Sequence, residues 1–354
     1  MGTLLNTAMS CPTLDQLPPP ATGQQGWPWT EATPPVAGTM PDGRPWPRIT
    51  IITPSYNQRR FVEETIRSVL LQGYPHLEYL VMDGGSTDGS VDTIRAYASW
   101  LTAWESAPDR GQGHAINKGL AQATGQILAW LNSDDVYRPG ALQQMALAFA
   151  RHPGAAVVVG GCAGTDANRR EVGRKTATFD PADLLIAGRG PAQPGVFFSR
   201  SARDRVGGLN EQLHYVLDKE YWFRIMSAFA PDAFILIAPV VAEMRSWERI
   251  KSLTGGLKVW DEYRFMVDQF YATSPRSAPY ARLRRAAYSQ IAWNTAWTHL
   301  VAGHRVQALR STLRAVWLAP GLHRPIDVCR HLGAALVPRK QPRQLGVAVA
   351  REAC

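Results

Sequence analysis

The stretches LEYLVMDGGSTDGS (77–90) and GQILAWLNSDDVY (125–137) each lead from an apolar, strand-like segment into a polar loop. Asp83 ends the first strand, and Asp134 and Asp135 follow the second. In open sheets of alternating strands and helices, ligands bind in the crevice outside the carboxyl ends of the strands. Carboxylates at that place suit a hard cation that carries phosphates, because Mg²⁺ is usually held by one or two carboxylates and by phosphate oxygens.

From residue 48 onward, strand-like and helix-like patterns alternate, which predicts βαβ units and a mostly parallel sheet in an α/β fold. Apolar residues at helical spacing predict a helix over 59–72, and Gly73 with Pro75 ends it. Further predicted strands lie at 48–56, 77–83, 103–107, 126–132, 155–161 and 194–200, and further helices at 90–98, 114–123, 139–150 and 218–229. Beyond residue 250 the pattern predicts helices only.

Composition is that of an ordinary globular protein: of 354 residues, 45% are hydrophobic and 19% are charged. The four cysteines are far apart and form no CxxC pair, which argues against a zinc site and suits a reducing compartment. No apolar run approaches the roughly 18 residues that span a bilayer, and the N-terminus has no secretory pattern. The cytoplasm is the expected location. Peripheral attachment to the inner face of the cell membrane is the alternative within it.

The net charge of +9 is unevenly distributed. Residues 245–354 hold 18 Lys and Arg against 6 Asp and Glu, whereas the rest of the chain holds 20 against 23. A basic segment of this kind binds nucleic acid or an anionic membrane surface.

Four blocks occur in order: RITIITPSYN (48–57), DGGSTDGS (83–90), WESAPDRGQGHAINKG (104–119) and LNSDD (131–135). A later block, PGVFFSR…GGLNEQLHYVLDKEYWFR, follows at 194–224. Together these blocks resemble the family 2 glycosyltransferases over residues 48 to about 245. The resemblance implies the GT-A fold, which binds nucleotide sugars, followed here by a C-terminal helical extension. It also implies an enzyme that builds bacterial surface polysaccharide.

The expected organisation has three parts. Residues 1–47 are rich in Pro and Gly and are predicted to be a disordered or loosely attached extension, although Trp27, Trp29 and Trp46 offer anchors. Residues 48–245 form the catalytic domain, with a nucleotide-binding half at 48–161 and an acceptor-binding half at 162–245. Residues 246–354 form a basic helical region.

The resemblance places a set of residues around the nucleotide. Asp83, followed by two glycines, reads an N–H of the base; a plain Asp-Gly turn is the alternative. Asn57 lines the pocket or caps the next helix, with equal weight. Arg110 and Lys118 are cations placed to meet the pyrophosphate. The full nucleotide set is Pro54, Tyr56, Asn57, Asp83, Gly84, Asp109, Arg110, Gln112, Asn117, Lys118, Asn132 and Asp134.

The LNSDD block corresponds to the family's Asp-x-Asp metal motif, with Asn132 in place of the first acid. An amide offers only its neutral oxygen, so Asp134 is expected to be the main metal ligand and Asp135 to assist it. Mn²⁺ or Mg²⁺ is the expected cofactor. Because Asp is the commoner residue, the motif predicts that a change of Asn132 to Asp is tolerated.

Inverting sugar transfer needs a general base that removes the proton of the acceptor hydroxyl. The resemblance assigns this role to Asp218, with Glu220 in support and Trp222 as an apolar floor under the acceptor. Gln193, Pro194 and His214 are further acceptor-binding candidates. The expected partners are a nucleotide-sugar donor, most commonly a UDP-sugar in this family, and a glycan or lipid-linked saccharide acceptor.

The sequence disfavours three other functions. A nucleotidyltransferase that makes nucleotide sugars shares the sheet, but it normally opens with a glycine-rich loop, whereas this chain has TPSYNQRR (53–60). A dehydrogenase is disfavoured because no GxGxxG follows a strand. A non-enzymatic nucleic-acid-binding protein is motivated by the basic tail, but that tail lacks exposed aromatics interleaved with its charges. No nucleic-acid partner is therefore expected.

Residues 276–343 contain 12 Lys and Arg and one acid, Asp327. Helices are predicted at 252–271, 279–301 and 304–318, the last two as a hairpin around Gly303. In 304–318 the residues Val306, Leu309, Leu313, Val316 and Trp317 recur at helical spacing, which predicts one apolar face for packing. Two readings stay open for this segment: a structural hairpin with a solvated basic face, or attachment to an anionic membrane surface.

Overall fold

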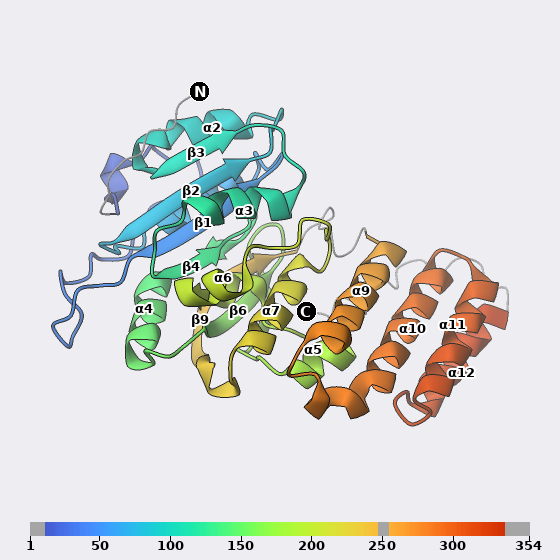
Figure 1. The fold of residues 1–354 in the computed structure, drawn as a ribbon. Coiled ribbons are helices and arrows are strands. Elements are labelled where there is room, and N and C mark those ends of the chain that lie inside the picture. Colours follow the sequence, from blue (N-terminus) through green and yellow to red (C-terminus); the bar gives the residue numbers. More distant parts are fainter. Residues whose placement is uncertain (1–10, 247–254, 337–354) are drawn as a thin grey trace. The chain divides into compact units, whose positions relative to one another are not determined.

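The computed structural model describes residues 11–246 and 255–336, which form two compact units (Figure 1). Unit 1 contains residues up to 179 together with 191–217 and 228–246. Unit 2 contains 180–190 and 218–227 together with the C-terminal helices. The predicted boundary at residue 245 is therefore incomplete, because two short segments of the expected catalytic domain pack with the C-terminal helices.

Parallel strands form the first half of unit 1. Strands β1 (Ile49–Ser55), β2 (Leu77–Asp83), β3 (Ala103–Ser106) and β4 (Ile127–Trp130) lie in the order β3-β2-β1-β4 and all run in the same direction. Every residue of β1, β2 and β4 is buried, as expected for a sheet covered on both faces. The expected α/β fold, with parallel strands in this part of the sheet, is confirmed.

The second half of the sheet contains antiparallel pairs. β8 (Val196–Ser199) runs antiparallel to β4 and to β6 (Val157–Thr165), and β6 pairs in parallel with β9 (Phe234–Arg245). Two further strands are β5 (Val136–Tyr137) beside β9 and β7 (Glu171–Lys175) beside β6. The sequence predicted none of β5, β7 and β9. β9 therefore lies close to the metal motif, because its partner strand β5 directly follows that motif in the chain.

Helices cover the sheet of unit 1. α3 (Gln112–Gln122) packs on β1 and β2, whereas α1 (Val62–Leu70) packs against β5 and α2 (Ser90–Ala96) (Figure 1). The other helices are α4 (Ala141–Arg151), α6 (Arg200–Val206) and the 3₁₀ turns Leu14–Gln16, Ala98–Trp100, Gln193–Gly195 and Pro231–Ala233. The predicted helices 59–72, 90–98, 114–123 and 139–150 are thereby confirmed within a few residues at their ends.

The described part of the N-terminal extension, residues 11–47, packs on unit 1, so the prediction of disorder or loose attachment is wrong there. Its anchors are apolar: Leu17, Trp29, Met40 and Trp46 are buried. The indole of Trp27 donates a hydrogen bond to the carbonyl oxygen of Tyr137 at 2.8 Å. Composition misled the prediction because a segment without helical or strand periodicity can still bury scattered aromatic residues.

A buried arginine of α1 binds this extension. The Arg67 side chain is fully buried and donates to the carbonyl oxygens of Pro18, Pro28 and Trp29 at 2.8–3.0 Å. Gly73, which ends α1 with φ +59°, has no room for a side chain, because a Cβ there would lie 2.5 Å from the Pro34 carbonyl oxygen. The extension is therefore part of the folded unit.

Unit 2 is helical. It consists of α5 (Pro181–Ala187), α7 (Leu217–Ala228), α9 (Leu257–Thr273), a 3₁₀ helix (Ala278–Leu283), α10 (Arg284–Val301), α11 (Arg305–Leu318) and α12 (Pro325–Leu336). α9, α10, α11 and α12 contact one another in chain order (Figure 1). The predicted hairpin around Gly303 is confirmed, and α12 was not predicted.

The packing face of α11 differs from the predicted one. Its buried residues are Ala308, Thr312 and Ala315, whereas Leu313 and Trp317, which were expected to pack, are exposed. Small residues allow α11 to approach its neighbours closely, so the large side chains are left on the outer side. Among the described helices, none is long and apolar enough to cross a membrane.

Candidate active site at the carboxyl edge of the parallel strands

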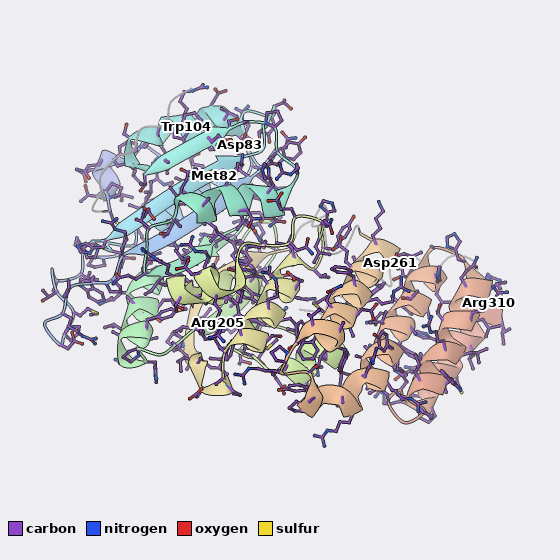
Figure 2. The ribbon with its side chains drawn as sticks, in the orientation of Figure 1. Met82, Asp83, Trp104, Arg205, Asp261 and Arg310 are labelled. Atoms are coloured by element: carbon purple, nitrogen blue, oxygen red, sulfur yellow. The ribbon has the colours of Figure 1, made fainter. Side chains whose placement is uncertain are left out.

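The ends of four parallel strands bring the predicted nucleotide residues together. Ser55 at the end of β1 pairs with Asp83 of β2, and Asp83 pairs with Ser106 of β3. Figure 2 shows Asp83 at the end of its strand, near Trp104 of β3. The backbone amide of Leu131 donates to the Ile52 carbonyl at 2.9 Å, so the loop that carries the metal motif begins beside β1. The loops after β1, β2, β3 and β4 therefore share one edge.

Asp83 organises the loop that follows it. Its fully buried carboxylate accepts hydrogen bonds from the backbone amides of Gly85 and Ser86 and from the hydroxyls of Ser86 and Ser106, at 2.6–3.0 Å. Three of these bonds end on Oδ2 and one on Oδ1. Since each carboxylate oxygen has two lone pairs, Oδ1 keeps one acceptor position. Asp83 thus has a structural role in the turn that follows β2.

Asn57 joins the loop after β1 to the loop after β2. The backbone amide of Asn57 donates to the Ser86 hydroxyl at 2.7 Å, and its side-chain Oδ1 accepts from the backbone amide of Thr87 at 2.9 Å. Its φ of +53° is a left-handed conformation that Asn tolerates better than most residues. Phe61, not Asn57, stands at the N-cap of α1. The structure therefore contradicts the capping role and shows Asn57 bridging the two loops, next to Tyr56, which is 63% exposed.

The loop after β3 packs directly on Gly84. A Cβ at Gly84 would lie 2.9 Å from Oδ2 of Asp109, so a side chain at this position would displace the Asp109 carboxylate. Asp109 also accepts from the Gly111 amide at 2.7 Å, which shapes the turn before α3. Pro54 is buried in β1.

The two predicted pyrophosphate cations are already paired with carboxylates. Arg110 donates twice to Oε2 of Glu211, and Nζ of Lys118 lies 2.9 Å from Oε1 of Glu105. Asn117 does not face a ligand either, because its amide binds both the backbone of Leu209 and Glu211. Hydrogen bonds from Asn117 and Arg110 hold the pKa of Glu211 below its usual range. In this conformation Asn117 of α3 and Arg110, just before α3, hold the loop that contains Leu209 and Glu211.

The metal motif is held by a chain of side-chain amides. Gln112 Nε2 donates to Asn132 Oδ1 at 2.7 Å, and Asn132 Nδ2 donates to Asp135 Oδ2 at 3.3 Å and to Gln193 Oε1 at 3.2 Å. Gln193 in turn donates to the Trp130 carbonyl at 2.7 Å. Asn132 thus uses its oxygen as an acceptor and its nitrogen as a double donor. Gln193, predicted to bind acceptor, supports the metal motif instead.

The two acids of the motif differ in environment. Asp135 is 3% exposed, and its Oδ1 accepts from the Arg245 amide of β9 at 2.9 Å. Burial, reinforced by the charge of Asp134, raises the pKa of Asp135 well above its usual range. Asp134 is only partly buried. Asp134 is therefore the better placed of the two to meet a cation from solvent, and Asp135 holds the loop.

An ionic network fastens β9 behind this loop. Arg245, with only 2% of its side chain exposed, donates to Glu64 of α1 at 2.6 Å and lies 4.5 Å from the Phe61 ring centroid. Arg169 bridges Glu64 and Glu243 at 3.0 and 2.8 Å. Charges buried in this way need partners, and the network supplies them from α1, β9 and the turn between β6 and β7.

The predicted base and its neighbours lie on α7. Glu220 is 9% exposed, and both of its carboxylate oxygens accept from Arg224, at 2.7 and 3.0 Å. Asp218, in the first turn, is half-buried. Trp222 is fully buried, which contradicts its predicted role as an open floor for the acceptor. α7 apart from Leu217 and Ala228 belongs to unit 2, and the nucleotide residues belong to unit 1.

The other acceptor candidates are divided. Pro194 is buried in the 3₁₀ turn before β8. His214 is exposed and lies against the loop before α3, since a Cβ at Gly111 would be 3.6 Å from its Nδ1. The structure thus brings His214 to the edge where the nucleotide residues gather.

Four contributing residues were not singled out by the sequence analysis: Ser106, Glu105, Glu211 and Arg245. Ser106 could have been found by aligning the ends of the parallel strands, since it stands at the end of β3 beside Asp83. Glu211 and Arg245 carry no such local signal, because their partners lie about a hundred residues or more away in the chain.

Comparisons with known proteins concern the family and the fold of this chain. Residues 50–207 match the family described as "Glycosyl transferase family 2". An uncharacterised glycosyltransferase of Nostoc sp. is 38% identical over 111 residues, which are 29% of this chain and 33% of that protein. TuaG of Bacillus subtilis, named for teichuronic acid biosynthesis, is 37% identical over 101 residues, 28% of this chain and 40% of TuaG. The matches thus span less than half the length of these curated relatives.

Two solved structures share the fold. S. aureus TarS, determined in complex with UDP-GlcNAc, aligns with a TM-score of 0.52 at 14% identity, covering 78% of this chain and 93% of that chain. The mannosyltransferase PcManGT of Pyrobaculum calidifontis, determined with GDP-Man and Mn²⁺, aligns with a TM-score of 0.54 at 21% identity, covering 82% and 89%. At these identities the likeness concerns the fold, and the expected GT-A fold is confirmed.

Proposed function

Since residues 50–207 are a family 2 glycosyltransferase domain, we propose that this protein is an inverting glycosyltransferase. It moves a sugar from a nucleotide diphosphate sugar to a hydroxyl of a glycan or lipid-linked acceptor. The observation that carries the proposal is the shared edge of β1, β2, β3 and β4, where Asp83, Asp109 and the Asn132–Asp135 loop meet. Ligands bind at this edge in open sheets of this kind.

The donor fits the nucleotide half of this edge. Tyr56 offers an exposed ring for stacking on a base, and Oδ1 of Asp83 keeps an acceptor position for a base N–H. A UDP-sugar is the proposed donor, because uracil presents such an N–H group. Guanine does so as well, so a GDP-sugar is the alternative that the experiment below separates.

The donor atoms at the metal motif fit a hard divalent cation. Asp134 would hold Mn²⁺ or Mg²⁺ directly and Asp135 would fix the loop, while oxygens of the diphosphate complete the shell. Among the described residues no group of three or more His, Cys, Asp or Glu could hold a metal by itself, so the diphosphate is needed for tight binding. Such a cation offsets the negative charge that develops on the departing nucleoside diphosphate.

Asp218 is the proposed general base. It takes the proton of the acceptor hydroxyl as the oxygen attacks the anomeric carbon and the bond from that carbon to the diphosphate breaks. The alternative, Glu220, is less suitable because Arg224 already donates hydrogen bonds to both of its oxygens. His214, exposed beside the loop before α3, is proposed to contact the acceptor.

The pathway is proposed from the relatives. TuaG carries a name that refers to teichuronic acid biosynthesis, so a role in surface polysaccharide assembly is the most specific reading of the family match. A cytoplasmic location is proposed together with this role, because the proposed donors of this enzyme are nucleotide sugars.

Thermal-shift measurements with UDP, GDP and TDP, each with and without Mn²⁺ or Mg²⁺, test the proposal. A ligand present at a hundred times its dissociation constant stabilises the folded state by about 2.7 kcal/mol. We expect the largest shift with UDP plus metal, and its loss in Asp134→Ala. A protein that responds to none of the nucleotides with either metal would contradict the proposed function, and a response to GDP alone would reassign the donor.

A further inference from the structure

The outer face of α11 combines large apolar side chains with arginines. Val306 is 60% exposed, Leu313 54% and Trp317 71%. Arg310 and Arg314, both exposed, lie between them on the same side of the helix, because residues 306, 310, 313, 314 and 317 recur at helical spacing. Figure 2 labels Arg310 on this helix. These five residues are called the α11 face below.

In the described part of unit 2, the α11 face lies outside the buried packing between the helices. The side of α11 that packs on α10 and α12 is made of Ala308, Thr312 and Ala315. Three large apolar side chains exposed on one short helix are a costly arrangement for a protein that stays in water, since each exposes apolar surface. The α11 face is therefore a candidate for contact with another surface.

The α11 face is strongly basic. Residues 284–318 contain no acidic residue. Among the described residues, no carboxylate lies within ion-pair distance of Arg310 or Arg314. Arg285 of α10 adds a further cation beside the face, because its guanidinium lies 5.8 Å from the Trp317 ring centroid and donates to the carbonyls of Trp317 and Leu318.

We propose that the α11 face docks on an anionic lipid surface. Helices that lie in the plane of a membrane interface carry aliphatic and aromatic residues that enter the acyl boundary, with Lys and Arg that bind anionic headgroups. Tryptophan favours the same interface. The α11 face supplies all three of these features from one helix of fourteen residues.

Two other occupants fit the α11 face less well. A nucleic acid would neutralise Arg310 and Arg314 but would leave Val306 and Leu313 without apolar contact. In a symmetric dimer each face meets its own copy, which would bring the arginines of two chains together without acids to pair them. A lipid surface satisfies both the charged and the apolar side chains.

The test is sedimentation of the full chain with vesicles of equal parts phosphatidylglycerol and phosphatidylcholine, compared with vesicles of phosphatidylcholine alone. We expect binding to the anionic vesicles only, and weaker binding as salt is raised, since surface charges are screened. Arg310→Gln/Arg314→Gln should lower the partition coefficient by on the order of 30-fold, about fivefold for each arginine. The charge-matched control is Arg151→Gln/Arg170→Gln, which removes two exposed arginines of unit 1 and should bind normally.

The apolar part of the α11 face is tested by Val306→Ser/Leu313→Ser/Trp317→Ser. This variant should keep the wild-type circular dichroism and melting temperature, because the three side chains are exposed, and should lose vesicle binding. Wild-type chain that does not bind anionic vesicles at low salt overturns the proposal, as does a triple variant that binds like the wild type. A wild-type dimer that the triple variant abolishes, or tight binding to a short duplex without vesicle binding, would assign the face to another occupant. The assay contains no nucleotide, so its outcome is independent of the proposed activity.

Discussion

Nδ2 of Asn132 lies 3.3 Å from Oδ2 of Asp135 and donates a hydrogen bond to it, in the loop expected to hold the metal. The same nitrogen donates to Oε1 of Gln193. An aspartate at position 132 would place an acceptor oxygen opposite two other acceptors. The structure therefore predicts that Asn132→Asp is harmful, whereas the metal motif alone predicts that it is tolerated.

We expect Asn132→Asp to lower the free energy of unfolding by about 1–3 kcal/mol, the range for leaving buried polar groups unsatisfied. Chemical denaturation at neutral pH measures the change. Asn210→Asp is the matched control. The Oδ1 of Asn210 accepts a hydrogen bond from the backbone amide of Gln212, and an aspartate would keep this acceptor. Equal stability of the Asn132→Asp protein and the wild type would show that the amide chain is not needed.

The two acids of the motif should be separable. Asp134→Ala is expected to abolish transfer and metal-dependent nucleotide binding while the melting temperature without ligands stays within a few degrees of the wild type, because Asp134 is only partly buried. Asp135→Ala should impair activity and also lower the melting temperature, because the Arg245 amide loses its acceptor. Calorimetric titration and thermal unfolding together measure both effects. Full activity of the wild type in excess EDTA would contradict the metal assignment.

The assignment of the base predicts a difference between two carboxylates of α7. Asp218→Asn should lower turnover by about 10² to 10⁴, the range for a lost general base, with nucleotide affinity unchanged. Glu220→Gln should reduce turnover less and should lower stability, because Arg224 loses its ionic partner. Steady-state kinetics and denaturation of the two variants test this. The opposite order of damage would exchange their roles.

The hydrogen bonds from Arg67 to the N-terminal extension should contribute strongly to the free energy of unfolding. Replacing it with leucine leaves the carbonyl oxygens of Pro18, Pro28 and Trp29 without their donor, so a loss of at least about 3 kcal/mol is expected. Arg95→Leu is the control, because the Arg95 side chain is 62% exposed and its loss should change stability by about 0.5 kcal/mol or less. If both variants unfolded at the same denaturant concentration, the extension would not be held as described.

His331 predicts a pH dependence for unit 2. The Trp293 ring stacks on the His331 ring at 3.9 Å and on the His323 ring at 4.2 Å. Burial, aided by His323 and opposed by Asp327, lowers the pKa of His331 to about 4. The unfolded chain therefore binds the proton more readily than the folded chain between the ordinary histidine pKa of about 6.5 and a pH of about 4.

The stability that neutral His331 contributes should be fully present above pH of about 6.5 and be lost progressively down to about 4. Thermal unfolding from neutral to acid pH measures this loss. His331→Phe keeps an aromatic ring for stacking but cannot be protonated, so its melting temperature should fall less steeply with acid. Parallel pH profiles for the two proteins would exclude His331 as the responsible group.

Much of the fold could be predicted from the sequence alone. The order of strands and helices from residue 48 to 161 depends on local periodicity and on Gly and Pro at the ends of elements, and these signals lie within short windows. The position of Asp83 and of Asp134 at strand ends is equally local, and parallel pairing then places strand ends on one edge. The location of the candidate site therefore followed from the sequence.

The detailed roles within that site were decided by tertiary structure. Arg110 and Lys118 looked like pyrophosphate cations, but Glu211 and Glu105 are already bound to them. Asn132 looked like a weak metal ligand, but its amide joins Gln112 to Asp135. Such pairings join residues from separate loops, and periodicity does not report which side chains meet.

The same limit explains the two surfaces that the sequence described wrongly. Residues 11–47 have no periodicity, yet scattered aromatic residues and the buried Arg67 hold them on unit 1. In α11 the spacing of apolar residues identified an apolar stripe, but small residues on the other side pack closely and leave Leu313 and Trp317 exposed. Sequence determined where apolar residues recur on each element. Only the fold decided which face is buried, because burial depends on how closely neighbouring elements can approach.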